Sequence, residues 1–172
     1  MKSKPDLAAL AQAYREFIAG FKTVLIASTN STNQPEASYA PYVEISDHYY
    51  IFISELATHT KNLLQNKQCS LLFIEDEDKA NNLFARKRVS LQCTAELVQK
   101  NSIDYSSTLD LFHERFGKFM QLLTRLPDFQ LFRLTPQTGN YVAGFGQAYT
   151  LSGGDLSQLK HRNPEAGNLR PN

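Results

Sequence analysis

The chain has 172 residues, 42% of them hydrophobic, which suits one domain with its own core. Its formal net charge of +1 gives no overall field that would attract nucleic acid or a membrane surface. No apolar run is long enough to span a bilayer, and the N-terminal segment carries charges where a signal peptide would be apolar. We therefore expect a cytoplasmic protein with neither a nucleic-acid nor a membrane partner.

The first half of the sequence predicts a helix, three strands and a second helix. Apolar residues recur at helical spacing over residues 5–20. Runs of β-branched and aromatic residues predict strands at 23–29, 36–45 and 49–54, separated by turn-forming residues. A short helix is expected over 58–66.

The next two predicted strands carry the only cysteines. Residues 69–76 begin with a nearly continuous apolar run, which indicates a strand buried on both faces. Residues 86–98 predict a strand with apolar side chains at every second position, which are Val89, Leu91, Cys93 and Ala95. We expect Cys69 and Cys93 to be buried, reduced thiols.

The remaining sequence predicts a helix over 103–125, a strand over 129–136, a turn at 138–140 and a strand over 141–151. Six or seven short strands with few helices indicate a mainly β (α+β) fold, a small antiparallel barrel with helices packed outside. We assign residues 1–156 to this domain. Residues 157–172 are a polar tail, expected to be poorly ordered unless another part of the protein holds it.

Polar and basic side chains gather where the third predicted strand meets the short helix. They are Ser54, Thr58, His59, Thr60 and Lys61. A helix N-terminus presents unpaired N–H groups and a partial positive charge, so these residues could bind a phosphate or another anion. An ordinary helix cap with solvated charges is the alternative reading.

Three other motifs have both a functional and a structural reading. The basic strand entry at 86–88 could anchor a second anion or form a solvated sheet edge. Gly144 and Gly146 around Phe145 suggest a bulge, or a backbone that a flat ligand approaches closely. The imidazole of His161, in the polar tail, could ligate iron or be merely solvated.

The order of these motifs resembles that of a known family. The segments "PEASYAPYV", "FISELATHTKNLLQN", "SLLFIEDEDKANNLFARKRVSL" and "LPDFQLFRLTPQTGNYVAGFGQAY" are similar to the pyridoxamine-phosphate-oxidase-like split-barrel superfamily, and more closely to its heme-utilisation branch. The resemblance covers residues 20–156. It implies a six-stranded antiparallel split β-barrel with peripheral helices, paired as a homodimer.

In flavin-binding members the resemblance implies FMN in two clefts between the subunits. The corner after the third strand would hold the phosphate, or a heme propionate, through Ser54, Thr58, His59 and Lys61. Lys87 or Arg88 would face the same cleft. Tyr39 and Gln147 would lie near the ring. These eight residues are the expected cofactor-binding set.

Heme-branch members bind heme and degrade it with oxygen and a reductant, releasing iron. Their iron ligand is a histidine that follows a glycine in the C-terminal extension, and an aspartate supports it. Asp128 matches that aspartate, but this chain has Gly167-Asn168 where the family has Gly-His, so His161 becomes the candidate catalytic iron ligand. Three functions stay open: heme binding with oxidative degradation, an FMN-dependent oxidoreductase, and a binder of heme or flavin without catalysis.

Overall fold

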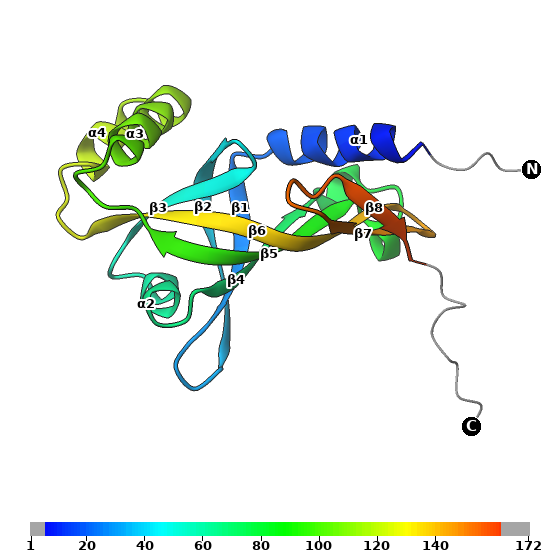
Figure 1. The fold of residues 1–172 in the computed structure, drawn as a ribbon, viewed down its shortest axis with the longest axis horizontal. Helices are drawn as coiled ribbons and strands as arrows, with labels where there is room; N and C mark the ends of the chain where they lie inside the picture. The colour runs from blue at the N-terminus through cyan, green and yellow to red at the C-terminus, as the bar shows by residue number, and fades with distance from the viewer. Residues whose placement is uncertain (1–5, 163–172) are drawn as a thin grey trace, which may run out of the picture.

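The computed structural model describes residues 6–162, and six of its antiparallel strands close into a barrel (Figure 1). These strands are β1 (Thr23–Thr29), β2 (Pro35–Ile45), β3 (His48–Ser54), β4 (Gln68–Ile74), β5 (Arg88–Leu97) and β6 (Phe129–Gly144). They are ordered β3-β2-β1-β4-β5-β6, and pairing of β3 with β6 closes the circle. The predicted six-stranded closed barrel is therefore confirmed.

Strand β6 is shared between the barrel and a hairpin that extends from it. Its first part, Phe129–Leu134, pairs with β3, and its last part pairs with β7 (Gln147–Ser152), which in turn pairs with β8 (Gln158–His161). The turn predicted at 138–140 is wrong because the strand runs on through these residues. A bulge between Gln92 and Cys93 of β5 absorbs the irregularity opposite Pro136.

Gly139 serves close packing within β6. A Cβ atom at this position would lie 2.8 Å from the Leu91 side chain and 2.9 Å from the Ser90 carbonyl oxygen. The turn actually comes at Phe145 and Gly146, where Gly146 adopts a φ of 70°.

The barrel interior follows the alternation that the sequence predicts. The four apolar positions of β5 are each at most 1% exposed, and Cys69 and Cys93 are buried, free thiols. Strand β4 differs from its prediction, because only Cys69, Leu71 and Phe73 are buried while Leu72 on the other face is partly exposed. The outer face of β4 is thus only partly covered by residues 6–162.

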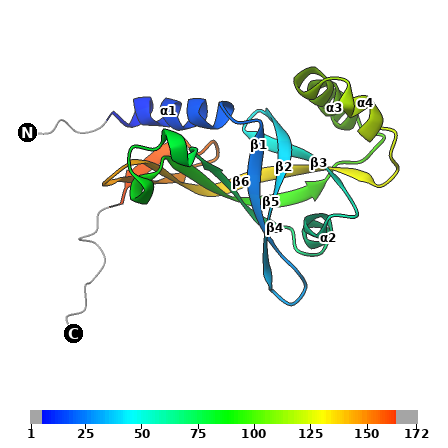
Figure 2. The ribbon, with the colours of Figure 1, turned by 180° about the vertical axis from the view of Figure 1, so that it is seen from behind.

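Helices flank the barrel at both ends (Figures 1 and 2). Helix α1 (Leu7–Ala19) lies over the β7–β8 hairpin, whereas α2 (Thr58–Gln65), α3 (Ile103–Phe116) and α4 (Phe119–Leu123) lie toward the other end. Two short 3-10 helices, Glu77–Lys79 and Leu83–Ala85, connect β4 to β5.

The single helix predicted over 103–125 is broken into α3 and α4. Gly117 ends α3 with a φ of 73°, a conformation that L-residues avoid, and its amide caps the His113 carbonyl. The break lets α4 fold back, so Phe112 and Met120 join Phe52 and Leu131 in a second, smaller core outside the barrel.

Strand β8 lies in the segment that the sequence assigns to a polar tail. It pairs with β7 and buries Leu159, so these residues belong to the sheet. The division into a domain and a tail at residue 156 stays a prediction, and Gly167-Asn168 lies outside the described residues. Within 6–162, no helix combines the length and apolar character needed to cross a membrane.

Candidate functional site

The predicted site residues fall into two groups at opposite ends of β6 (Figure 1). The first group, which we name the α2 end, comprises Tyr39, Ser54, Thr58, His59, Lys61 and Asp128. The second, which we name the β8 end, comprises Lys87, Arg88, Gln147 and His161. Sixteen residues of strand span about 50 Å, so Asp128 and His161 of one chain do not meet.

At the α2 end, Ser54 fastens the end of β3 to the start of β6. Its hydroxyl donates to Asp128 Oδ2 at 2.5 Å and accepts from the Leu56 amide at 3.1 Å. The Ser54 carbonyl accepts from the Thr60 hydroxyl at 2.6 Å. The hydroxyls of Ser54 and Thr60, which the sequence suggested as anion ligands, thus have hydrogen-bond partners within the protein.

The start of α2 has the features of an anion site. Ala57 precedes the helix and provides no side-chain cap, so the amides of Thr58 and His59 lack the usual side-chain acceptor, whereas the Thr60 amide donates to the Ala57 carbonyl at 3.1 Å. Thr58 and Lys61 lie exposed on this first turn. These groups could hold a phosphate or a carboxylate.

His59 is the one side chain of this end with an unmet polar atom. It is 9% exposed, and its Nε2 is buried with no hydrogen-bond partner among the described residues. Burial lowers the pKa of His59, with Glu36 opposing the shift. A neutral imidazole with a free Nε2 can donate to or accept from a ligand, or bind a metal.

An apolar groove of about 540 Å³ opens beside this corner, between the barrel and the α3–α4 pair. We name it the aromatic groove. It is lined by Tyr39, Ala40, Pro41, Phe52, Ile53, Ser54, Ala57, His59, Phe112, Phe116, Phe119, Met120, Leu123 and Phe129. The groove thus brings together three predicted site residues, Tyr39, Ser54 and His59, against a wall of phenylalanines. Its size and composition suit a flat, largely apolar ligand with a polar edge.

At the β8 end, the two predicted basic residues lie apart. Lys87 lines a separate pocket of about 390 Å³ with Gly144 and Phe145, and its Nζ lies 5.7 Å from the Phe17 ring centroid. Arg88 takes the other face of β5 and donates to the Arg86 carbonyl at 3.0 Å. Lys87 and Arg88 therefore do not serve one pocket of this chain.

His161 contacts the β6–β7 turn, directly before Gln147. Gln147 starts β7 and is exposed. His161 Nε2 lies 3.0 Å from the Gly146 carbonyl oxygen, and the imidazole packs edge-on against Tyr149. A carbonyl oxygen can only accept, so Nε2 carries a proton, and in the neutral imidazole Nδ1 then keeps its lone pair.

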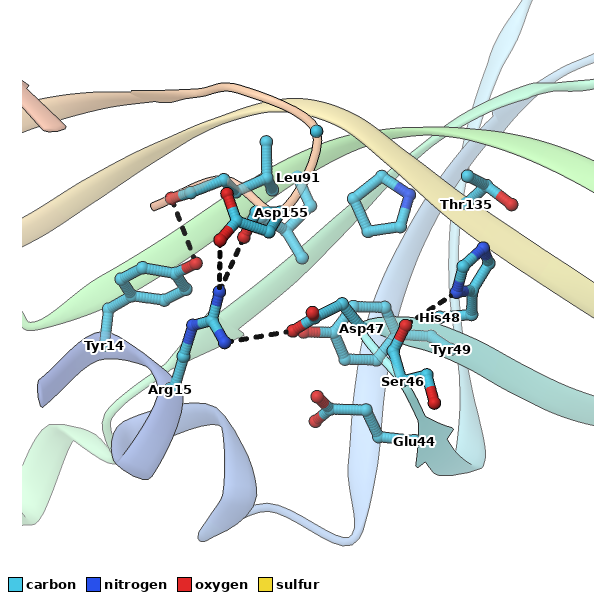
Figure 3. Close-up of a pocket in the computed structure, with 13 residues that line it drawn as sticks. Tyr14, Arg15, Glu44, Ser46, Asp47, His48, Tyr49, Leu91, Thr135 and Asp155 are labelled. Atoms are coloured by element: carbon cyan, nitrogen blue, oxygen red, sulfur yellow. Dashed lines mark hydrogen bonds and ion pairs between the residues drawn. The ribbon is translucent and has the colours of Figure 1, made fainter. Parts of the chain in front are cut away.

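A smaller cavity, of about 130 Å³, lies between α1, the β2–β3 turn and the β7–β8 turn (Figure 3). Arg15 dominates it by donating to the Asp155 carbonyl at 2.6 Å and pairing with Asp47 at 3.3 Å. Because these bonds use the charged groups internally, we assign the cavity a structural role. No group of three His, Cys, Asp or Glu side chains within 6–162 could hold a metal.

The outer face of β2, β1, β4 and β5 carries apolar side chains that no helix of the described chain covers. Tyr39 is 65% and Leu25 46% exposed, and cross-strand register aligns Tyr39 with Leu25 and Leu25 with Leu72. Next to Leu72, Ile74 faces Arg88 of β5. We name this surface the barrel face. It connects Tyr39 of the aromatic groove to Arg88.

Sequence reasoning missed the phenylalanine wall of the groove. Phe112 and Phe116 recur at helical spacing within the predicted helix 103–125, and that spacing indicates only one apolar helix face. The excess of phenylalanines over what one stripe needs was a signal, since Phe119 remains 65% exposed in the fold.

Comparison with known proteins agrees with this architecture. Residues 10–143 match the family model described as pyridoxamine 5'-phosphate oxidase. The chain is 42% identical over 147 residues to the heme oxygenase HutZ of Vibrio cholerae, a match that covers 86% of this chain and 84% of HutZ.

Solved structures give the same relationship. The crystal structure of HutZ, described as a heme storage protein from Vibrio cholerae, has a TM-score of 0.70 at 38% identity, covering 73% of this chain and 89% of that one. Campylobacter jejuni ChuZ has a TM-score of 0.85 at 29% identity, covering 99% of this chain and 68% of that one. The chain therefore belongs to the pyridoxamine 5'-phosphate oxidase family, in its heme-utilisation branch.

Proposed function

We propose that the protein is a homodimer that binds heme between its subunits and degrades it oxidatively. The observation that carries this proposal is the aromatic groove, which ends at the unpartnered Nε2 of His59 and the uncapped start of α2. A porphyrin is a flat apolar ring with two carboxylates at one edge. The phenylalanine wall fits the ring, and Thr58 and Lys61 fit the carboxylates.

The barrel face supports pairing of two copies. Contiguous exposed apolar side chains on a sheet are unfavourable in water, and a second copy of the same face would cover them. Leu25 would lie at the centre of this contact and Arg88 at its rim. The partial exposure of Leu72, which the sequence predicted to be buried, supports the same arrangement.

Pairing would also join the two ends of the site. Asp128 and His161 lie at opposite ends of β6, so only two different chains could bring them together. A carboxylate beside a ligating imidazole orients the ring and raises its basicity. We therefore assign His161 Nδ1 as the iron-ligating atom and Asp128 as its supporting carboxylate from the other copy.

The chemistry would divide between the bound group and the protein. Bound heme supplies the iron at which oxygen is reduced. The protein's residues hold the ring between aromatic side chains, bind its carboxylates at α2 and exclude bulk water from the groove. HutZ carries the name heme oxygenase, and this relationship supports extending the same activity to this chain.

Hemin titration with light scattering tests the proposal directly. We expect a dimer that takes up one hemin per subunit with a Soret band, and loss of this band when ascorbate and oxygen are added. His161→Ala should move the Soret maximum, whereas His48→Ala should not, because His48 neither lines the aromatic groove nor lies on β8. A colourless protein after hemin titration would overturn the proposal.

FMN is the second candidate, and the uncapped start of α2 is the observation that favours it. A phosphate dianion is a good ligand for free helix amides with Thr58 and Lys61 beside them. Quenching of FMN fluorescence on titration, with no competition by hemin, would identify a flavin protein. Hemin that binds but survives ascorbate and oxygen would identify a binder without catalysis.

A further inference from the structure

Strand β8, which carries His161, is weakly attached by its own sheet contacts. It has four residues, lies at the end of the sheet order and pairs only with β7 among the described strands. Of its residues, only Leu159 is buried. An edge strand this short needs other contacts to keep a fixed position.

Helix α1 supplies those contacts (Figure 3). Tyr14 donates its hydroxyl to the Leu156 carbonyl at 3.2 Å, a buried bond between residues 142 positions apart. Arg15 bonds the Asp155 carbonyl at 2.6 Å and its carboxylate at 3.8 Å, while its other nitrogen reaches Asp47 at 3.3 Å. The turn that leads into β8 is thus tied to α1 and to the β2–β3 turn.

A row of aromatic rings continues from α1 to His161. The centroids of Tyr14 and Tyr141 are 6.0 Å apart, those of Tyr141 and Tyr149 6.3 Å, and those of Tyr149 and His161 5.2 Å. We name Tyr14, Tyr141 and Tyr149 the tyrosine row. All three are at most 3% exposed, so close packing limits the movement of each ring.

The imidazole of His161 is therefore fixed on two sides. Tyr149 contacts its ring, and the Gly146 carbonyl accepts the proton of Nε2 at 3.0 Å. Gly146 presents this carbonyl from a φ of 70°, which a residue with a side chain would adopt only with strain. The Nδ1 lone pair is left to face outward. Metal-ligating histidines commonly have their second nitrogen held by a carbonyl in this way.

We propose that Tyr14 and Arg15, acting through the tyrosine row and the β7–β8 turn, are positioning residues that hold His161 ready to ligate. The role of His161 as an iron ligand rests on the proposed function. The fixed position of its ring does not, because it is a property of the protein without ligand. Neither residue touches the proposed ligand. Helix α1 is thus part of the cofactor site rather than only a cover for the barrel.

Arg15→Met is the central variant because it removes the charge while leaving the buried contacts of α1. Arg15→Lys keeps one ion pair and should restore part of the effect. Tyr149→Leu removes the ring beside His161, and Tyr149→Phe keeps it. Arg133→Met is the matched control, since it breaks an ion pair of similar exposure, Arg133–Glu96, away from His161.

The first measurement is the carbon-bound proton signal of the His161 ring in the full-length, ligand-free protein, assigned with His161→Gln. We expect Arg15→Met and Tyr149→Leu to shift and broaden this signal. Arg15→Lys, Tyr149→Phe and Arg133→Met should leave it near its wild-type position. A signal unchanged in Arg15→Met and Tyr149→Leu overturns the proposal whether or not heme binds.

The second measurement is hemin affinity. Loss of outer contacts around a metal-ligating histidine costs at least about tenfold in affinity, so Arg15→Met should bind hemin about tenfold more weakly than Arg133→Met. A moved His161 signal with unchanged hemin affinity would overturn the link to the cofactor. If the wild type binds no hemin, the proposed function is wrong. The His161 proton signal then tests by itself whether Tyr14 and Arg15 position the imidazole.

Discussion

The two ends of the barrel are built differently. At the α2 end, Ser54, Thr60 and Asp128 are fixed by short hydrogen bonds, and a deep groove is already formed. At the β8 end, His161 is exposed on an edge strand. The difference teaches that one chain carries a formed groove and, at the other end of β6, the histidine that we propose as the iron ligand. The proposed site therefore needs the two ends from different copies of the chain.

The largest effect on hemin binding should come from preventing two copies of the chain from pairing through the barrel face. Leu25→Arg places a charge at the centre of the barrel face, and an unpaired buried charge costs several kcal/mol, so the dimer should weaken at least about 100-fold. Sedimentation or light scattering would show a monomer with little hemin uptake. Leu97→Arg is the control, because Leu97 is 40% exposed but lies outside that face. A dimer that survives Leu25→Arg would contradict the arrangement.

The second prediction concerns the Ser54–Asp128 bond, which gives the α2 end its fixed geometry. Asp128→Asn should lower the free energy of unfolding by about 2 kcal/mol, because the bond is charge-assisted and partly buried. Chemical denaturation measures this change. In a double-mutant cycle with Ser54→Ala the two losses should not add. Additive losses would mean that Asp128 acts through other contacts.

The third prediction tests the groove itself. Phe119→Ala removes one exposed aromatic side chain that lines the groove. It should weaken hemin binding by about 1 kcal/mol, or about fivefold, with little loss of stability because the side chain is exposed. Leu122→Ala provides a matched comparison, because Leu122 is 55% exposed on the same helix but does not line the groove. Equal hemin affinities of the two variants would place the ligand elsewhere.

The smallest expected effect is a pH dependence of the free energy of unfolding that comes from His59 at the α2 end. Burial lowers the pKa of His59 below its ordinary 6.5, so the unfolded chain takes up a proton that the folded chain resists. The free energy of unfolding should therefore fall as pH drops through 6.5 toward the folded pKa. His59→Gln should flatten this slope and His48→Gln should not, as measured by denaturation at several pH values.

Much of the barrel could be predicted because its strands follow simple alternation. In β5, alternation of apolar and polar residues is enough to predict which side chains are buried. The four apolar side chains all face the interior, and they are Val89, Leu91, Cys93 and Ala95. Strand β4 was harder, since Leu72 is apolar on an outer face. Leu72 is only partly buried in the structure, and local pattern does not distinguish such an outer apolar position from a core position.

Sequence prediction is least specific for residue types that have more than one structural role, such as glycine, serine and threonine. Gly139 was interpreted as a turn, but it permits close approach of β5, whereas Gly117 was passed over within an apolar helical pattern and breaks the helix through its positive φ. The hydroxyls of Ser54 and Thr60 fit either an anion site or a structural role by sequence, and in the structure both make internal hydrogen bonds. Sequence places such residues correctly but does not tell which neighbour satisfies them.

The bond from Tyr14 to Leu156 also constrains how the chain is made. Helix α1 is synthesised before the strands of the barrel, yet the buried Tyr14 hydroxyl finds its acceptor only after 142 further residues have been added. During translation this helix must wait beside a growing, incomplete sheet with its apolar stripe unprotected. A nascent chain halted before residue 156 should therefore be a better chaperone client than the finished protein.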